Sequence, residues 1–332
     1  MVKYIEKQPE RILKNQGQKM KTEFEIVKYE KINNANIFIV EMDYRTPHLH
    51  RDFEISFILE GHSTLVINGK RYEGNAEDVF ILNPTNPHEI FTHGDVGATI
   101  LCLQISPRFF SDTLPAMSNV FFDVSNINLP ENSEWIASFR RTLIESAIAY
   151  MNPHQNSHLY CAARINDIFY MLLENVPHHY LSIADQQAIG RKVDRILRFF
   201  EFVDLNFMHK INLQDFAETE GVSLNYMSSF IKKNLNKTFR EYVSDVRFSQ
   251  ACKLLTIENK RLTDVFLESG FSDLRYLTKA FLQRTGMRPN EYRSKHKNLR
   301  NEYKYKSSLH SSEKLYSNEE ALRILDYLKT CY

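Results

Sequence analysis

Three histidines and one glutamate have the types and spacing of a binding or metal site. His48, His50 and Glu54 lie in the segment HLHRDFEISFILEG, and His88 follows in NPTNPHEI. Alternate residues of a β-strand point to the same face, so we expect the side chains at 48, 50 and 54 to converge. His88, from another strand, would complete three imidazoles and one carboxylate, which are ligands that a divalent metal accepts.

The elements that carry these residues are predicted to be short strands. From about Phe24 to Gln104, runs rich in Val, Ile, Phe, Tyr and Thr alternate with turn residues. Asn68-Gly69, between two alternating runs, predicts a type I′ hairpin. Strands spaced in this way indicate an antiparallel barrel or sandwich.

After Pro130 the apolar residues follow a helical period, in WIASFRRTLIESAIAYM and HLYCAARINDIFYMLLENV. In the second segment we expect the apolar face to consist of Leu159, Ala162, Ala163, Ile165, Ile168, Phe169 and Leu172. These two helices are expected to lie on the barrel or to form a dimer interface. The pair His178-His179 is expected in a loop.

Composition indicates an ordinary globular protein of about two domains, with 332 residues, 43% of them hydrophobic, and a net charge of +1. No run reaches the roughly 20 apolar residues of a membrane helix, and the N-terminus has no apolar signal core, so we expect a cytoplasmic protein.

Cys102, Cys161, Cys252 and Cys331 stand far apart, which favours reduced, buried thiols. Residues 185–300 carry 21 Lys+Arg against 14 Asp+Glu, and the remainder 21 against 27, so the basic surplus lies in the C-terminal half.

That half contains an internal near-repeat. LQDFAETEGVSLNYMSSFIKKNLNKTFREYV matches LTDVFLESGFSDLRYLTKAFLQRTGMRPNEYR at an offset of 49, which becomes 50 after one inserted residue. Each copy predicts a short helix, a turn at Gly221 or Gly270, and a second helix with Ser223 or Ser272 as its N-cap. The segment REYVSDVRFSQACKLLT predicts a helix that joins them. The pattern indicates two helix-turn-helix motifs with polar, partly basic outer faces, a shape that enters the DNA major groove.

Residues from about 190 to 297 resemble the DNA-binding domain of the AraC/XylS family of bacterial transcription regulators. The signature runs from Gly270 to Arg293 and includes Phe281, Gly286, Pro289 and Tyr292. The resemblance implies base contacts from Asn225, Ser228 and Ser229 in the first copy, and from Leu274, Arg275, Thr278 and Lys279 in the second. Contacts with phosphates are expected from Lys232, Lys233, Arg240 and Arg288.

The sequence departs from the family pattern at several positions. This chain has Phe266 where the family has Ala, Leu277 where an aromatic residue is usual, Leu282-Gln283 where a Lys pair is frequent, Ser229 where Arg is common and Asn236 where Gly is common. Asn tolerates the left-handed backbone conformation, so the change at Asn236 is mild. The other departures leave the fold expected, but the family's base preferences do not transfer to this chain.

The spacing of His48, His50, Glu54 and Gly61 resembles the first motif of small-barrel cupins, and His88 resembles the histidine that ends the second. The second motif is degraded at Glu77 and Asn86. Three interpretations stay open. The resemblance to AraC-type sensors implies a small effector, often a sugar; the residue types also suit a metal ion, structural or bridging to the effector; and the side chains could simply be hydrogen-bonded at strand ends. Tyr44, Arg45, Tyr72 and Asn83 are further candidates for the pocket wall.

We therefore predict an α+β protein with an N-terminal cupin-like β-barrel, a helical extension, and a C-terminal all-α domain of two helix-turn-helix motifs joined by a linker helix. The expected segments are a flexible arm (1–22), the effector-binding barrel (23–125), a helical dimerisation and linker region (126–184), the DNA-binding domain (185–297) and a tail (298–332). The sequence SNEE at Ser317–Glu320 predicts a capping box that starts a short helix in the tail.

The leading functional hypothesis is a ligand-responsive transcription regulator, with activation implied by the family resemblance. Its expected partners are double-stranded promoter DNA, a small effector, a second copy of the chain and, for an activator, RNA polymerase; no membrane partner, no catalysis and no cofactor beyond the possible divalent metal are expected. The alternative is a metal-dependent cupin enzyme with an appended DNA-binding module, but no P-loop, GxGxxG, GxSxG or HExxH motif supports catalysis. A helical half that binds protein instead of DNA is a third hypothesis.

Overall fold

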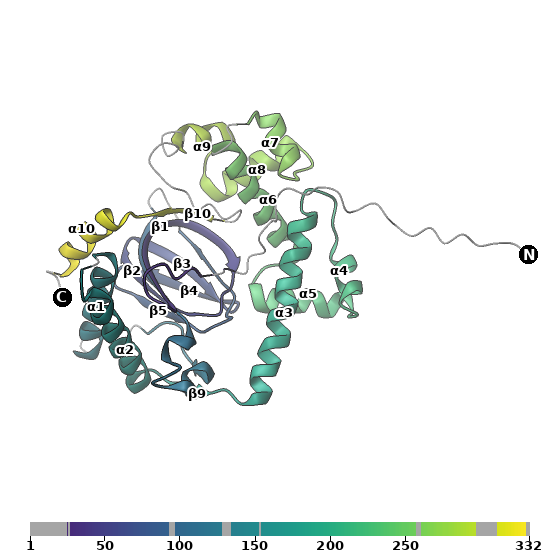
Figure 1. The fold of residues 1–332 in the computed structure, drawn as a ribbon. Coiled ribbons are helices and arrows are strands. Elements are labelled where there is room, and N and C mark those ends of the chain that lie inside the picture. Colours follow the sequence, from purple (N-terminus) through teal and green to yellow (C-terminus); the bar gives the residue numbers. More distant parts are fainter. Residues whose placement is uncertain are drawn as a thin grey trace, which may run out of the picture.

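The computed structural model describes residues 25, 27–92, 97–127, 134–152, 154–256, 260–296 and 311–329. The predicted arm at residues 1–22 and Cys331 lie outside the described residues. A curled antiparallel sheet forms the N-terminal half and a helical domain follows it, as the sequence predicts (Figure 1).

The sheet is a half-barrel with the strand order β4-β3-β6-β1-β7-β2-β5. Its strands are β1 (Ala35–His48), β2 (Phe53–Glu60), β3 (His62–Ile67), β4 (Lys70–Asn75), β5 (Val79–Leu82), β6 (His88–Phe91) and β7 (Ala98–Ile105). The hairpin between β3 and β4 is confirmed, because Asn68 and Gly69 have φ angles of 51° and 80°, as a type I′ turn requires. Side chains of β2 alternate between the two faces of the sheet, and Glu54, Ser56 and Ile58 share the face that lines the inside of the curl. The carboxylate of Glu54 can therefore lie inside the sheet among apolar side chains.

Two long helices cover the outer face of the sheet, α1 (Glu134–Met151) and α2 (Ser157–Asn175). The prediction for α2 is partly wrong, because Leu159 is 76% exposed and Ala163 is also exposed. The buried face instead contains Cys161, Ile165, Ile168, Phe169 and Leu172. The segment is apolar on two sides, and only one side fits against the sheet.

Short elements connect these layers, namely the 3₁₀ turns η1 (Pro107–Phe110) and η2 (Pro115–Asn119), and the strands β8 (Val120–Phe122) and β9 (His178–Tyr180). The expected loop at His178-His179 is wrong, since both residues belong to β9, which pairs with β8. Cys102, Cys161 and Cys252 are buried, as predicted, and form no disulfide within the described part of the chain, and burial raises the pKa of the Cys161 and Cys252 thiols to about 12.

The helical domain begins with α3 (Ile183–Asn206) and contains both predicted helix-turn-helix motifs. The first consists of α4 (Leu213–Thr219) and α5 (Leu224–Leu235), and the second of α7 (Leu262–Glu268) and α8 (Leu274–Thr285). The joining helix α6 (Phe239–Thr256) has 18 residues and is roughly 27 Å long at 1.5 Å per residue. Helix α9 (Pro289–His296) closes the second motif.

The turns follow the predicted chemistry with one exception. Gly221 and Gly270 have φ angles of 64° and 77°, and Asn236 adopts the left-handed conformation at the end of α5. Ser223 caps α5 by accepting the backbone N–H of Tyr226. The prediction for Ser272 is wrong: the inserted residue shifts the cap to Asp273, whose carboxylate accepts the N–H of Arg275 at 2.7 Å.

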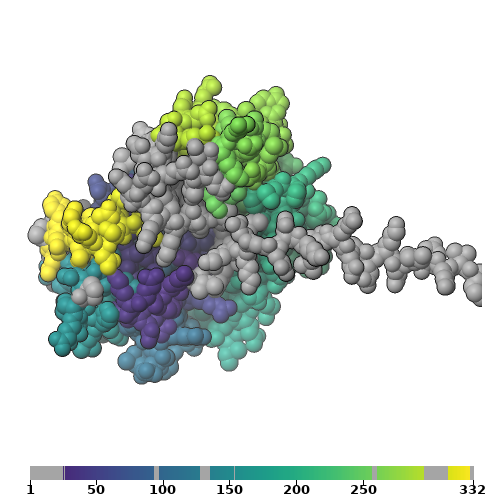
Figure 2. All heavy atoms as spheres, turned by 45° about the horizontal axis from the view of Figure 1, so that its top comes forward, coloured from purple at the N-terminus to yellow at the C-terminus, as the bar shows by residue number. Residues whose placement is uncertain are grey.

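After the second motif the chain returns to the sheet. Strand β10 (Ser311–Leu315) pairs antiparallel with β1, and α10 (Asn318–Lys329) packs against α1 with Ala321 and Leu325 in the shared core. Figure 2 shows this yellow segment beside the teal helices. The predicted capping box is present, because Ser317 and Glu320 exchange hydrogen bonds. Among the described residues, none of the helices is sufficiently long and apolar for a membrane span.

Candidate functional site

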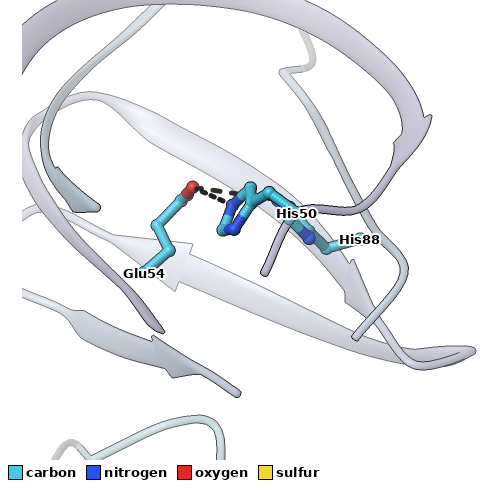
Figure 3. Close-up of side chains that lie close together, drawn as sticks. All are labelled: His50, Glu54 and His88. Atoms are coloured by element: carbon cyan, nitrogen blue, oxygen red, sulfur yellow. Dashed lines mark hydrogen bonds and ion pairs between the residues drawn. The ribbon is translucent and has the colours of Figure 1, made fainter. Parts of the chain in front are cut away.

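The four predicted ligand residues lie together inside the curled sheet. His48 ends β1, Glu54 lies in β2 and His88 begins β6, while His50 lies in the connection between β1 and β2. None of the four is more than 5% exposed. The expected single strand from 48 to 54 is wrong, because the chain turns after Leu49, yet the turn still directs His50 toward Glu54 (Figure 3).

Glu54 is the centre of a hydrogen-bond network. Its carboxylate lies 2.9 Å from His50 Nε2, accepts the Ser56 hydroxyl at 2.8 Å and accepts the Gln104 amide at 3.2 Å. His88 Nε2 is 3.8 Å from the same carboxylate. Burial by itself raises the pKa of Glu54, but the hydrogen bond from His50 and the charges of His88 and His50 outweigh burial and hold that pKa well below its usual range.

The three imidazoles have the same orientation relative to the backbone. The Nδ1 atoms of His48, His50 and His88 lie 3.0, 3.1 and 2.9 Å from the carbonyl oxygens of Thr46, Asp52 and Asn86. A carbonyl oxygen only accepts, so a ring that makes this bond carries its proton on Nδ1. His50 has an alternative, because its Nδ1 is also 3.4 Å from the Asp52 N–H.

His88 is the least satisfied of these groups. Its Nε2 is buried and has no hydrogen-bond partner among the described residues, an arrangement that carries a free-energy cost unless something binds there. Burial lowers the pKa of His88 to about 4 and that of His48 well below its usual value. For His50 burial acts in the same direction, but the hydrogen bond and charge of Glu54 prevail and raise its pKa.

Ligand atoms of His50, Glu54 and His88 all lie within 4.8 Å of one another, a spacing that suits a metal ion. In a tetrahedral zinc site, ligand atoms about 2.1 Å from the ion are roughly 3.4 Å apart. His48 does not belong to this group, since its Nε2 faces Glu25 at 3.7 Å, although its ring lies 4.0 Å from that of His88. The structure thus brings three of the four predicted ligands to one point and leaves His48 beside them.

Sequence reasoning missed three residues at the site, Glu25, Ser56 and Gln104. The Gln104 amide donates to Glu54, and its oxygen accepts a hydrogen bond from Asn36. Ser56 and Gln104 are polar residues within the apolar runs FEISFILE and ATILCLQI, and this interruption is a signal that could have found them. No comparable signal marks Glu25, which pairs with Arg45 at 2.6 Å.

The further candidates for the pocket wall make their contacts elsewhere. Tyr44 hydrogen-bonds Ser249 of α6, and Asn83 bonds the backbone of Phe122. The ring of Tyr72 packs against Phe80. Arg45 pairs with Glu25, which approaches His48, and also with Glu313 of β10.

The predicted DNA-contacting residues lie on the exposed faces of the two recognition helices and just beyond them. Exposed in the first unit are Asn225, Ser228, Ser229, Lys232, Lys233 and Arg240, and in the second Leu274, Arg275, Lys279 and Arg288. Thr278 is half-buried and donates to the carbonyl of Leu274. The guanidinium of Arg275 pairs with Asp273 at 2.9 Å, so part of its charge is already neutralised.

Two exposed tyrosines on these faces were missed. Tyr226 and Tyr276 occupy equivalent positions in α5 and α8 and are 48% and 60% exposed. Identical residues 50 positions apart at an outward position are the signal that could have found them. The hydroxyl of Tyr226 accepts a hydrogen bond from Arg195 of α3, so this ring also supports the first unit.

The two halves are also in direct contact. Leu49 is fully buried within the core of the first helix-turn-helix unit, and Glu89 lies 2.5 Å from Lys237, which precedes α6. Gly69, at the tip of the β3–β4 hairpin, lies so close to α5 that a Cβ there would collide with the carbonyl oxygen of Lys233.

Comparisons with known proteins agree with this architecture. Residues 39–173 match a family model described as an AraC-like ligand binding domain, and residues 216–295 match a helix-turn-helix domain model that spans both motifs. The chain belongs to the AraC/XylS family of transcriptional regulators. Its fold therefore combines an AraC-type ligand-binding domain with a helix-turn-helix DNA-binding domain.

Among curated relatives, the uncharacterized HTH-type transcriptional regulator YdeC of Bacillus subtilis (strain 168) is 25% identical over 278 residues, covering 82% of this chain and 92% of the relative. An uncharacterized HTH-type transcriptional regulator of Staphylococcus aureus (strain MRSA252) is 21% identical over 240 residues, which is 72% of this chain but 31% of that protein. The crystal structure of ToxT from Vibrio cholerae O395 is 14% identical, with a TM-score of 0.40, and the match covers 79% of this chain and 98% of that one.

Proposed function

We propose that this AraC/XylS-family regulator is a transcriptional activator whose ligand binds at His48, His50, Glu54 and His88. The observation that carries the proposal is a buried ionisable cluster, including an imidazole nitrogen without a partner, inside a domain that matches a ligand-binding family model. Buried polar groups are normally hydrogen-bonded, and exceptions concentrate at functional sites. Ligand binding in the sensor would then change how the exposed faces of α5 and α8 bind DNA.

Two classes of ligand fit the site. Imidazoles, a carboxylate and the Gln104 amide can hydrogen-bond the hydroxyls of a sugar or related metabolite, for which the closed site would have to open, since its four principal residues are at most 5% exposed. The second candidate is a divalent metal ion, which needs far less space than a sugar. The His88 Nε2 atom, which lacks a hydrogen-bond partner among the described residues, favours this candidate because it could coordinate the ion. His50, Glu54 and His88 would hold the ion and Gln104 would orient Glu54, as groups outside the ligand set commonly do.

A homodimer is part of the proposal. Helix α2 presents an outward row of Leu159, Ala163 and Tyr170, spaced four and seven residues apart, and Leu159 and Tyr170 are 76% and 64% exposed. Such a row suits packing against a second copy of the same helix. A dimer would also double the number of DNA-binding units. The gain in affinity from binding through two linked domains would offset the weak electrostatic attraction that follows from the modest positive charge of each chain.

The DNA-binding part is tested by selecting a duplex from a random library with the full chain and measuring its affinity as salt is varied. Several phosphate contacts predict a steep fall, with a slope of about −0.9 per contact on logarithmic axes. A flat dependence, or no binding at low salt, would contradict DNA binding. Transcription in vitro with RNA polymerase then tests activation, and repression of the selected promoter would contradict the activator assignment.

The metal candidate is tested by titrating the purified full chain with Co²⁺ and following the visible absorption of the bound ion. We expect one ion per chain, and loss of binding on the order of 100-fold or more in His88→Ala, since changes outside the ligand set already cost about 10- to 100-fold. The control is His62→Ala, which removes an exposed imidazole on β3 that faces Glu73. Equal binding by both variants would exclude this metal site. Turnover of a substrate by the metal-loaded chain would instead favour the alternative, a cupin enzyme with an appended DNA-binding module.

A further inference from the structure

The residues that connect the sensor to the DNA-binding domain alternate with the residues of the ligand site. Leu49 stands between His48 and His50, and Glu89 directly follows His88. Neighbouring side chains of an extended chain point in opposite directions. The same two stretches of backbone therefore present one set of side chains to the site and the other set to the helical domain.

Leu49 belongs to the core of the first helix-turn-helix unit rather than to the core of the sheet. It is fully buried in a cluster with residues of both helices of that unit and of the flanking helices, including Phe199 of α3, Phe216 of α4 and Met227 of α5. Interiors are packed too closely for such a side chain to shift without moving its neighbours. A displacement of the backbone at His48 or His50 would therefore disturb the packing of this cluster.

Glu89 begins a chain of ion pairs that reaches both units. Its carboxylate lies 2.5 Å from Lys237, Lys237 lies 2.7 Å from Asp245 in α6, and Asp245 lies 2.5 Å from Arg284 in the last turn of α8. Glu89 is only 4% exposed, so water screens its pair weakly. Whatever moves β6 at His88 also moves the anchor of this chain.

The β3–β4 hairpin, which pairs with β6, makes a third contact between the sheet and the helical domain. Ile67 pairs with His88, and the N–H of Asn68 donates to the carbonyl of Pro87 at 2.7 Å. The next residue, Gly69, touches the backbone of Lys233 near the end of α5. Only glycine fits this approach, because a side chain would collide with that carbonyl.

We infer that Leu49, Gly69 and Glu89 form a clamp on the first helix-turn-helix unit, and that the His48/His50/Glu54/His88 site controls the clamp. The inference rests on the proposed ligand-binding role of that site. A ligand that binds the closed and open clamp with different affinities shifts the equilibrium between them, and the effect is reciprocal. The clamp thereby links the ligand to the position of α5 relative to α8.

The test is a double-mutant cycle on the full chain, read by amide hydrogen exchange without DNA. The variants are Glu89→Gln, His88→Ala and the two combined, and the region measured is α4–α5. We expect each single variant to speed exchange there by about fivefold or more, the low end of ordinary coupling between sites. The double variant should exchange about as fast as the faster single variant, because both changes open the same clamp.

Glu73→Gln is the matched control, since it makes the same change on β4, two strands away from β6 in the same sheet, where the carboxylate pairs with Arg71 and His62. Exchange in α4–α5 should be unchanged in this control. Unchanged exchange in Glu89→Gln, or fully additive effects in the double variant, would overturn the clamp. Should His88→Ala fail to fold, His50→Gln replaces it in the same cycle with the same two outcomes.

The cycle separates failure of the clamp from failure of the proposed function. A chain that binds the selected duplex but shows additive exchange effects is a regulator without this clamp. A chain with coupled exchange but no affinity for duplex DNA retains the clamp, and the regulatory proposal is then the part that fails.

Discussion

The two helix-turn-helix units share a fold but differ in what holds them and in what they present. The first contains Leu49 of the sensor in its core, and its recognition helix is uncharged over Asn225, Ser228 and Ser229. The second touches the sensor at its edge through Tyr44, and its recognition helix presents Arg275 and Lys279. This comparison indicates that the sensor contacts the core of the first unit but only the edge of the second, and that charge at the predicted base-contacting positions lies in the second.

The turns of the two units differ as well. Before Gly221, Glu220 pairs with Arg195 at 2.9 Å and with Arg198 at 2.5 Å, which ties the turn to α3. At the equivalent position of the second unit, the buried Ser269 donates to the carbonyl of Val265. The same turn is therefore held by an ion cluster in one copy and by a hydroxyl in the other.

The largest expected effect is on the shared core of the first unit. Leu49→Ala should lower the free energy of unfolding by about 2–5 kcal/mol, as expected for truncating a fully buried leucine. The measurement is denaturant unfolding of the full chain, with Leu267→Ala, a leucine of α7 that is 64% exposed, as a control that should change stability by no more than about 0.5 kcal/mol. Equal effects of the two variants would contradict the burial of Leu49 in this core.

The next effect is on DNA affinity. Lys279→Ala should weaken binding to the selected duplex by about 1–3 kcal/mol if it contacts a base, whereas a phosphate contact would reduce the salt slope by about 0.9. Ser229→Ala, at the equivalent position of the first unit, should leave that slope unchanged because no charge is removed. Lys329→Ala, in α10 of the sensor half, controls for net charge, and a loss as large as that of Lys279→Ala would contradict the assignment of the reading face.

A smaller effect is expected where the second unit touches the sensor. Tyr44→Phe removes the hydroxyl that lies 3.2 Å from Ser249 Oγ but keeps the ring against Phe248. The expected loss is about 0.5–1.5 kcal/mol of stability, typical of a single hydrogen bond. A loss equal to that of Leu49→Ala would remove the proposed difference between the two contacts, and thermal unfolding of both variants in one buffer decides this.

The smallest effect concerns acid pH. The hydrogen bond from Arg198 lowers the pKa of Glu220 to about 2 from its ordinary value near 4.5. Its contribution to stability is thus complete above about pH 4.5 and is lost as the pH falls toward 2. Because Arg198 is half-exposed, we expect less than about 1 kcal/mol. Between pH 5 and pH 3, the free energy of unfolding should fall less in Glu220→Gln than in the parent chain. Denaturant unfolding at both pH values measures this, and equal falls in the two proteins would contradict the effect.

Local patterns were sufficient to place the exposed faces of α5 and α8. Exposure along α5 and α8 follows the helical period, so Asn225, Ser229 and Lys279 could be placed outward from spacing alone. The exception at Ser272 arose because a one-residue insertion shifts a cap without changing the helix that follows. The apolar face of α2 failed for a different reason, since two of its sides are apolar and only contact with the sheet selects between them.

The ligand site was only partly predictable. The spacing of His50 and Glu54 correctly indicated that these two side chains meet, although the chain turns between them. Whether His48 joins the other three depends on Glu25, which arrives from outside the predicted motif. Ser56 reaches the Glu54 carboxylate from two positions along the same strand, whereas Gln104 reaches it because β7 pairs with β2 in the register that places Gln104 opposite Glu54.

The sequence by itself determined the two helix-turn-helix units, their glycine turns and their exposed faces, because helix period and turn chemistry act over a few residues. The tertiary structure decided that Leu49 enters the helical core, that Glu89 anchors Lys237, and that the tail returns to pair with β1. These contacts join residues more than a hundred positions apart, and their free energy comes from packing and charge pairing that no local pattern records.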